Sequence, residues 1–382
     1  MTKIDQIETV VVDVPTIRGH VLSMATMRSQ TAVLVRIRFS DGSTGIGEGT
    51  TIGGLTYCVE SPESIQSAIA TYIAPALKGK GADDVNTSIQ LMDKLVRGNR
   101  IAKAAVEIAL WDGLGKRLGV PVSKLFGGQV YARMPGAWTL ASGSSDTDIA
   151  EALEMIETRR HNIFKLKIGK RSVRDDVAHV AAIKRAVGDA GSVRVDINQA
   201  WSLHDARWGL KGLQDAGCEL VEQPVQGRYV EAQRELTAKY EIAVMADEVL
   251  NGPEDALEIA ANAAADVFAV KVAQSGGIKR ASEVVAIGQA AGLGLYAGTM
   301  LETGLGTAAA LQLFCTVEKL SWGTELFGPL LLTDDILAEP INYNDFCVEV
   351  PQGVGIGVAL DDDKVAYFDR NKSTPQKHLA EV

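Results

Sequence analysis

The hydrophobic pattern of the first part of the chain predicts an antiparallel α+β module. Apolar side chains alternate with mostly polar ones over residues 33–39, which is typical of a strand. Asp41-Gly42 then supplies a hairpin turn, and residues 43–49 return as the next strand. Residues 102–119 carry apolar side chains at helical spacing and end at a glycine, which predicts a helix.

After about residue 130, short apolar segments alternate with amphipathic helical patterns at a period of roughly 25 to 30 residues. Such unbroken apolar segments indicate parallel strands that are buried on both faces. The pattern favours a (β/α)8-type barrel. A doubly wound sheet is the alternative, but the first strand-to-helix turn lacks the Gly-x-Gly-x-x-Gly loop that favours it. The predicted strands are 136–141, 164–168, 193–198, 220–224, 244–248, 267–272, 293–299 and 321–326.

Three parts follow from this change of pattern. We expect residues 1–130 to form the N-terminal α+β module, and its segment 50–61 reads as a mobile loop because it has a Gly-Gly pair and little periodicity. Residues 131–340 form the barrel. Residues 341–382 contain a strand-like segment, "NDFCVEVP", and are expected to pack back on the N-terminal module.

Composition and charge narrow the range of possible binding partners. The net charge of −10 disfavours nucleic acid, because phosphate binding needs a basic surface. No uncharged apolar run reaches the ~18 residues that span a bilayer, and acidic residues interrupt any signal-like N-terminus. The four cysteines are widely spaced, as in reduced core positions. We therefore expect a cytoplasmic protein without a membrane partner.

Three carboxylates lie at the C-terminal ends of consecutive predicted barrel strands: Asp196, Glu222 and Asp247. In a barrel these ends meet at the face where active sites are built. Three neighbouring carboxylates repel one another, and a divalent cation removes that penalty. Oxygen ligands without histidine or cysteine favour Mg²⁺ or Mn²⁺ over zinc. The alternative is that each acid is a helix N-cap or an ion-pair partner.

Lysines flank these carboxylates in the predicted barrel. Lys165 and Lys167 stand on the same face of the second strand, and Lys271 ends the sixth. A carboxylate substrate between them could lose or gain a proton at its α-carbon through an enolate that a divalent ion stabilises. The alternative is that Lys165 and Lys167 extend to solvent at the strand end. Glu325 ends the eighth strand.

Histidine chemistry is disfavoured by position. None of the five histidines falls at the end of a predicted barrel strand, so neither a histidine base nor a Ser-His-Asp triad is expected. They are His20, His161, His179, His204 and His378.

The strand-end set Lys-x-Lys, Asp, Glu, Asp and Lys resembles that of the enolase superfamily, and within it the muconate-lactonizing subgroup. "TTIGGLTYCVESPE", "VRVDINQAW" and "WGTELFGPLLLT" extend the resemblance over about residues 4 to 370. The resemblance implies an N-terminal α+β capping domain over a modified (β/α)7β TIM barrel. It also implies lactonization of cis,cis-muconate, a small dicarboxylate, in aromatic degradation by the β-ketoadipate pathway.

The resemblance implies a role for each site residue. The implied metal ligands are Asp196, Glu222 and Asp247, with Mn²⁺ or Mg²⁺ as cofactor. Lys167 is the implied acid and base, Lys165 the neighbouring charge that favours its neutral amine, and Lys271 the opposite cation. Glu325 closes the site. Residues implied to contact or support the substrate are Ile52, Tyr57, Phe327 and Asn198, with Glu248 behind them.

Several alternatives share the metal and the lysines. They are a chloromuconate cycloisomerase, a dipeptide epimerase and an o-succinylbenzoate synthase. An epimerase needs an acid for the substrate ammonium, and Glu302 is the one that the seventh strand end offers. A metal-dependent binding protein without activity is the remaining alternative, although no ligand or lysine is missing. The resemblance further implies a homo-oligomer, an octamer.

Overall fold

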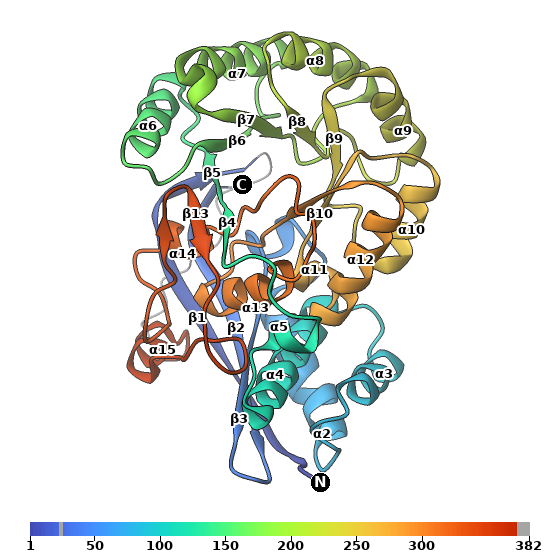
Figure 1. Ribbon diagram of the computed structural model, residues 1–382, viewed down its shortest axis with the longest axis vertical. Coiled ribbons are helices and arrows are strands. Elements are labelled where there is room, and N and C mark those ends of the chain that lie inside the picture. Colours follow the sequence, from blue (N-terminus) through green and yellow to red (C-terminus); the bar gives the residue numbers. More distant parts are fainter. Residues whose placement is uncertain (23–25, 373–382) are drawn as a thin grey trace.

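An antiparallel sheet forms the N-terminal part of the computed structural model, which describes residues 1–22 and 26–372 (Figure 1). Its order is β1–β2–β3, with bounds Ile4–Val21, Thr26–Phe39 and Thr44–Thr50. Gly42 turns the chain between β2 and β3 with a φ of 84°, a left-handed conformation that glycine adopts without strain. The predicted hairpin is confirmed.

Helix α4 (Arg100–Leu118) packs unusually closely on β3. The glycine-rich face of β3 allows this approach: a Cβ added at Gly45 would lie 2.0 Å from the Ala109 carbonyl oxygen, and one at Gly47 2.1 Å from that of Ala105. Both glycines point to one face because strand side chains alternate. The remaining helices of this part are α1 (Pro62–Ala68), α2 (Ala74–Leu77), α3 (Val85–Leu95) and α5 (Val122–Leu125).

We expect Gly47→Ala to lower the free energy of unfolding by about 3 kcal/mol or more, because the new methyl group meets backbone that cannot rotate away. Denaturant unfolding measures the change. Gly19→Ala is the matched control, since its added Cβ makes only an ordinary 3.4 Å contact with Thr26. Equal stability of the two variants would show that α4 can move off the sheet.

The second sheet is a curled parallel sheet with the order β11–β10–β9–β8–β7–β6–β5. Its strands are β5 (Ala137–Leu140), β6 (Ile163–Lys167), β7 (Ser192–Asp196), β8 (Leu220–Glu222), β9 (Ala243–Ala246), β10 (Val267–Val270) and β11 (Gly294–Ala297). Helices surround it (Figure 1). They are α6 (Ser145–Glu157), α7 (Val173–Val187), α8 (Leu203–Asp215), α9 (Val230–Lys239), α10 (Pro253–Ala261), α11 (Val272–Ser275), α12 (Ile278–Ala290) and α13 (Gly304–Phe314).

Helix α13 differs from the others because every one of its residues is buried. It contacts β3 as well as the barrel helix α12, so it lies between the barrel and the N-terminal sheet. Among the described residues, no helix combines the length and the apolar character that crossing a membrane would require.

The barrel closes through a single residue. Thr324 forms parallel bridges to Ala297, the last residue of β11, and to Gly136, the residue before β5. The prediction of a full strand over 321–326 is therefore wrong: Gly323 turns there with a φ of 71°, and only one residue pairs. The helix that follows, α14 (Gly328–Leu331), has only one turn. This gives a (β/α)7β barrel, so the fold class is confirmed and the doubly wound sheet is excluded.

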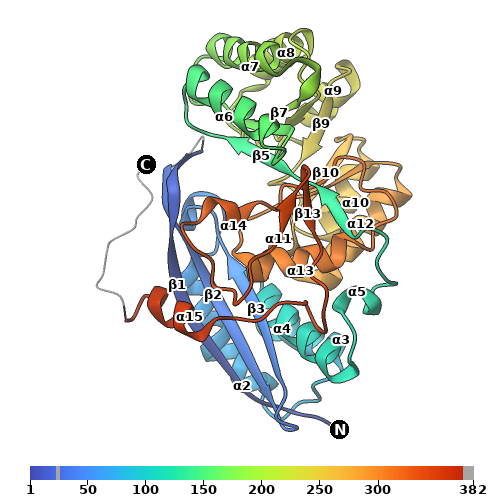
Figure 2. The same ribbon diagram turned by 60° about the vertical axis from the view of Figure 1, so that its left-hand side comes forward.

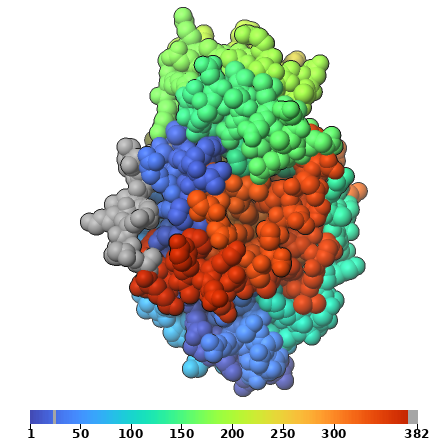
Figure 3. Space-filling view, turned by 90° about the vertical axis from the view of Figure 1, so that its left-hand side faces the viewer, coloured from blue at the N-terminus to red at the C-terminus, as the bar shows by residue number. Residues whose placement is uncertain are grey.

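The C-terminal residues lie along two earlier parts of the chain. Strand β13 (Cys347–Glu349) pairs with β12 (Tyr343–Asn344) and with β4 (Arg133–Pro135), not with the N-terminal sheet. Helix α15 (Asp362–Phe368) then lies against β1, and the following Arg370 pairs with Asp13 at 2.7 Å. Figures 2 and 3 show this segment in red beside the blue N-terminal strands.

Candidate active site

Three fully buried carboxylates meet at the C-terminal edge of the parallel sheet. Asp196 ends β7, Glu222 ends β8, and Asp247 follows β9 directly. One oxygen of each lies within 4.8 Å of an oxygen of each of the others. Asp196 and Glu222 are direct partners in the parallel register, which explains why neighbouring strands bring them together. The structure thus unites the three acids that the sequence selects.

The three carboxylates of this acidic triad repel one another. Burial raises the pKa of Glu222, and repulsion by Asp196 adds to the rise, so that it lies well above its usual range despite Lys165. The neighbouring Glu248 is affected in the same way: burial, and to a smaller extent repulsion from Asp247 and Asp196, raises its pKa to about 8. Positive charge is therefore needed at this point.

Two of the three acids also carry a buried oxygen without a hydrogen-bond partner in the described part of the chain: Oε1 of Glu222 and Oδ1 of Asp247. Buried acceptors of this kind are costly unless a ligand or ion completes them. All the oxygens come from carboxylates, the donors that hard divalent cations prefer. By charge and by chemistry, the triad fits such a cation.

Lys165 lies inside the acidic cluster. Its Nζ contacts Glu222 at 3.0 Å and Asp196 at 3.8 Å, and it also forms an ion pair with Glu325. Burial lowers the pKa of Lys165, but Glu222 and Glu325 outweigh burial and hold the pKa well above its usual range. Lys165 is therefore a fixed positive charge in this arrangement.

Lys167 lies on the same face of β6, nearer the end of the strand. Its Nζ is 2.5 Å from Oδ2 of Asp196 and 3.4 Å from Oδ1 of Asn198. The side chain of Lys167 is 10% exposed, against 3% for Lys165. Of the two lysines, Lys167 is thus the one that can exchange protons with solvent.

Lys271 and Tyr57 lie at the other carboxylate of the cluster. Lys271 follows β10, and its Nζ lies 2.7 Å from Oδ2 of Asp247. The Tyr57 hydroxyl donates to the same oxygen at 2.8 Å and accepts from Lys271 at 2.5 Å. Burial lowers the pKa of Lys271, but Asp247 and Glu222 raise it overall. Tyr57, from the loop over residues 50–61, is thereby hydrogen-bonded to two residues of the barrel.

Glu325 and Asn198 complete the polar network. Glu325 accepts from the Thr299 amide at 3.2 Å, just after the bridge that closes the barrel. Asn198 donates through Nδ2 to Asp196 and to Glu248, at 3.1 Å each. Its φ of 44° is left-handed, a conformation that asparagine tolerates better than most residues. The side-chain amide of Asn198 thus bridges Asp196 and Glu248.

A small, partly open cavity lies between this network and the N-terminal part. Its lining contains the predicted substrate contacts Ile52, Tyr57 and Phe327 with the three lysines. Ile52 is 5% and Phe327 2% exposed, so both also serve as packing. The full lining is His20, Leu22, Ile52, Tyr57, Thr139, Lys165, Lys167, Glu222, Lys271, Thr299, Leu301, Glu325 and Phe327.

The sequence did not single out His20 and Thr139. Thr139 lies within β5, one residue before its end, and His20 belongs to β1, outside the barrel. Searching barrel strand ends for histidine could not find a residue that the capping sheet supplies. Of the other histidines, His161, His179 and His204 are absent from the cavity lining, and His378 lies outside the described residues.

Family models match both parts of the chain. The model described as "Mandelate racemase / muconate lactonizing enzyme, N-terminal domain" matches residues 6–127, and that described as "Enolase C-terminal domain-like" matches residues 148–364.

Individual relatives agree with these matches. Muconate cycloisomerase 1-1 of Acinetobacter lwoffii is 54% identical, over 96% of this chain and 97% of that protein. A chloromuconate cycloisomerase of Pseudomonas sp. (strain P51) is 45% identical, over 96% and 99%. The crystal structure of muconate lactonizing enzyme from Pseudomonas fluorescens complexed with muconolactone has a TM-score of 0.96 and 50% identity, over 97% of this chain and 100% of that chain. The resemblance drawn from the strand ends is confirmed.

Proposed function

The chain belongs to the mandelate racemase / muconate lactonizing enzyme family, and from this premise we propose that it catalyses the reversible lactonization of cis,cis-muconate to muconolactone. The observation that carries the proposal is the buried acidic triad with lysines on both sides, under a loop that contributes Tyr57. Cationic groups around an acidic metal site suit a dianionic substrate.

We propose that Asp196, Glu222 and Asp247 hold Mn²⁺ or Mg²⁺. Such a cation supplies positive charge that stabilises an enolate. Lys165 and Lys271 stay charged on the two sides of the triad and orient the substrate carboxylate. Glu325 fixes Lys165, and Asn198 fixes Asp196, so both act on the substrate through another side chain.

Lys167 moves the proton in this proposal. One carboxylate oxygen of muconate adds to a carbon of the distal double bond, and the electron pair of that bond moves toward the other carboxylate. Lys167 gives a proton from Nζ to the carbon next to that carboxylate, and in reverse it removes the same proton. Each turnover takes up one proton, which Lys167 regains through its solvent-accessible side chain. Ile52 and Phe327 keep water from the reacting carbon.

The epimerase alternative loses support from the geometry of Glu302. Its carboxylate accepts from Thr299 Oγ1 at 2.5 Å and from the Met300 amide at 2.9 Å, and it is absent from the cavity lining. It is therefore not available for a substrate ammonium group. Chlorinated muconates remain the second candidate substrate, favoured by the 45% identical relative.

The test is the ultraviolet absorbance of cis,cis-muconate with the Mn²⁺-loaded enzyme, measured beside 3-chloromuconate and a dipeptide. We expect loss of the muconate signal, a lower kcat/KM for 3-chloromuconate and no dipeptide epimerization. Faster turnover of 3-chloromuconate would assign the second candidate, and epimerization alone would overturn the proposal.

The octameric assembly, the cytoplasmic location and a place in aromatic degradation also stay proposals that rest on this function. Light scattering of the purified enzyme measures the assembly.

A further inference from the structure

The last residues of β1 cross from the capping sheet to the first barrel strand. The regular β1–β2 register is interrupted between Pro15 and His20. In this stretch Arg18 donates to the Thr139 carbonyl oxygen at 3.2 Å and pairs with Glu151 of α6 at 3.0 Å. The Val21 amide reaches the Ala141 carbonyl oxygen at 3.4 Å. These contacts dock the segment on the end of β5, as Figure 2 shows.

His20 lies in this docked segment and faces the active-site cavity. It is 1% exposed, and neither of its ring nitrogens has a hydrogen-bond partner among the described residues. A buried polar group without a partner costs free energy, and such groups are rare in folded proteins. Because His20 lines the cavity, its two unpartnered ring nitrogens are available to a ligand there.

The surroundings of His20 are cationic. Burial lowers the pKa of His20, and the positive charges of Lys167, Arg18 and Lys165 lower it further, well below its usual range. The ring is therefore neutral at pH 7, with one N–H donor and one acceptor nitrogen. A neutral donor among three cations suits a carboxylate, which accepts hydrogen bonds and is attracted by the charges.

We propose that the ring N–H of His20 donates a hydrogen bond to the substrate carboxylate that closes the lactone ring, and so makes the site selective for the open dicarboxylate. The assignment rests on the proposed function. The other carboxylate of muconate is directed to the acidic triad between Lys165 and Lys271. His20 lies on the capping side of the cavity, near Lys167. It therefore contacts the second carboxylate of the substrate, the one that closes the lactone ring.

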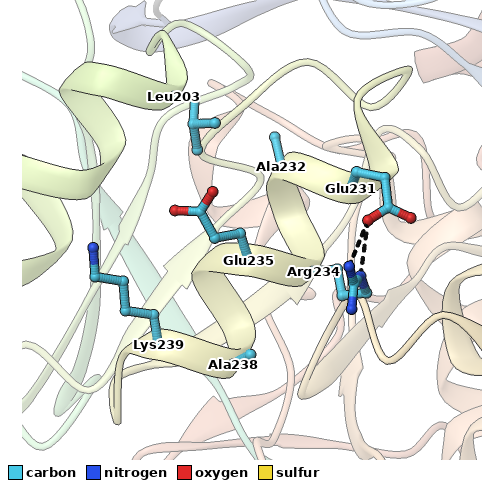
Figure 4. A pocket seen from close by; sticks show the side chains of 7 residues that line it. All are labelled: Leu203, Glu231, Ala232, Arg234, Glu235, Ala238 and Lys239. Carbon is cyan, nitrogen blue, oxygen red and sulfur yellow. Dashed lines mark hydrogen bonds and ion pairs between the residues drawn. The ribbon is translucent and has the colours of Figure 1, made fainter.

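The groove on the surface between α8 and α9 does not offer a comparable group. The groove between α8 and α9 in Figure 4 is lined by charged side chains that already pair: Glu231 with Arg234 at 2.8 Å, and Glu235 with Arg207 at 2.7 Å. Those side chains are exposed and satisfied, whereas His20 is buried and unsatisfied.

The test compares His20→Leu with His20→Gln and His20→Asn, which place an amide N–H near the Nε2 or the Nδ1 position. We expect His20→Leu to raise KM for muconate by about 10- to 100-fold, the range for losing a hydrogen bond to a charged group. The KM for muconolactone in the reverse reaction should change less than about 3-fold, because the lactone has lost this carboxylate. One of the two amide variants should restore most of the muconate affinity.

Two internal checks belong to this experiment. The overall equilibrium is fixed, so the ratio of forward to reverse kcat must rise by the same factor as the ratio of the two KM values. The thermal midpoint of His20→Leu should not fall, since the change removes two unpaired buried nitrogens. His204→Leu on the exposed face of α8 is the matched control.

The possible outcomes separate the role of His20 from the proposed function. An unchanged KM for muconate in His20→Leu, or an equal rise for muconate and muconolactone, would overturn the assignment and leave His20 a packing residue. A wild-type enzyme that does not turn over muconate would instead overturn the proposed function, and with it the substrate assigned to His20. Failure of both amide variants to rescue would show that shape and not the N–H matters.

Discussion

Replacing Lys167 by alanine is expected to lower kcat for muconate lactonization by about a thousandfold or more, the scale of a lost general acid. The fold should persist, because Asp196 keeps its hydrogen bonds from the Asn198 backbone amide at 2.8 Å and side-chain amide at 3.1 Å. Mn²⁺ affinity should change little, since Lys167 contacts only one of the three acids in the structure.

Hydrogen exchange separates the role of Lys167 from a general loss of activity. In D₂O, the wild-type enzyme should exchange the proton next to the carboxylate of muconolactone, as nuclear magnetic resonance can follow. Lys167→Ala should not, even when muconolactone still binds. Lys170→Ala, at an exposed lysine three residues later, is the control. Exchange or lactonization at a near wild-type rate in Lys167→Ala would show that another group moves the proton.

The strand-end residues could be predicted from the sequence for a simple physical reason. Parallel barrel strands all end at one edge, so charged residues at successive strand ends must converge. Asp196, Glu222 and Asp247 meet for this reason, and their position explains the two lysines of β6. Lys165 is buried and Lys167 is mostly buried because the strand ends in an acidic cluster.

Contacts between distant segments could not be predicted in the same way. A period of two identifies a strand but not its partner, so the pairing of β13 with β4 has no local signal. The eighth barrel strand is predicted over residues 321–326, but Trp322 lies beside the glycine that begins β11 and only Thr324 pairs. His20 reaches the cavity through the docking of Arg18, which is a tertiary contact.

Removal of the divalent cation is the second change with a large expected effect. A chelator should abolish lactonization, and added Mn²⁺ should restore it. Glu222→Gln should act similarly while the protein stays folded. The amide matches the shape of the acid and removes a carboxylate that Asp196 and Glu325 repel, although Lys165 loses one of its ion-pair partners.

Calorimetric titration with Mn²⁺ makes this prediction independent of turnover. We expect Glu222→Gln to weaken Mn²⁺ binding by about a hundredfold or more, because one of three charged ligands is lost. Glu219→Gln is the matched control, since Glu219 is exposed just before β8, at the end opposite to Glu222. Wild-type Mn²⁺ affinity in Glu222→Gln would remove Glu222 from the ligand set. Full activity of a chelated, metal-free enzyme would contradict cation stabilisation of the enolate, because three lysines alone would then have to balance the buried carboxylates of the cluster.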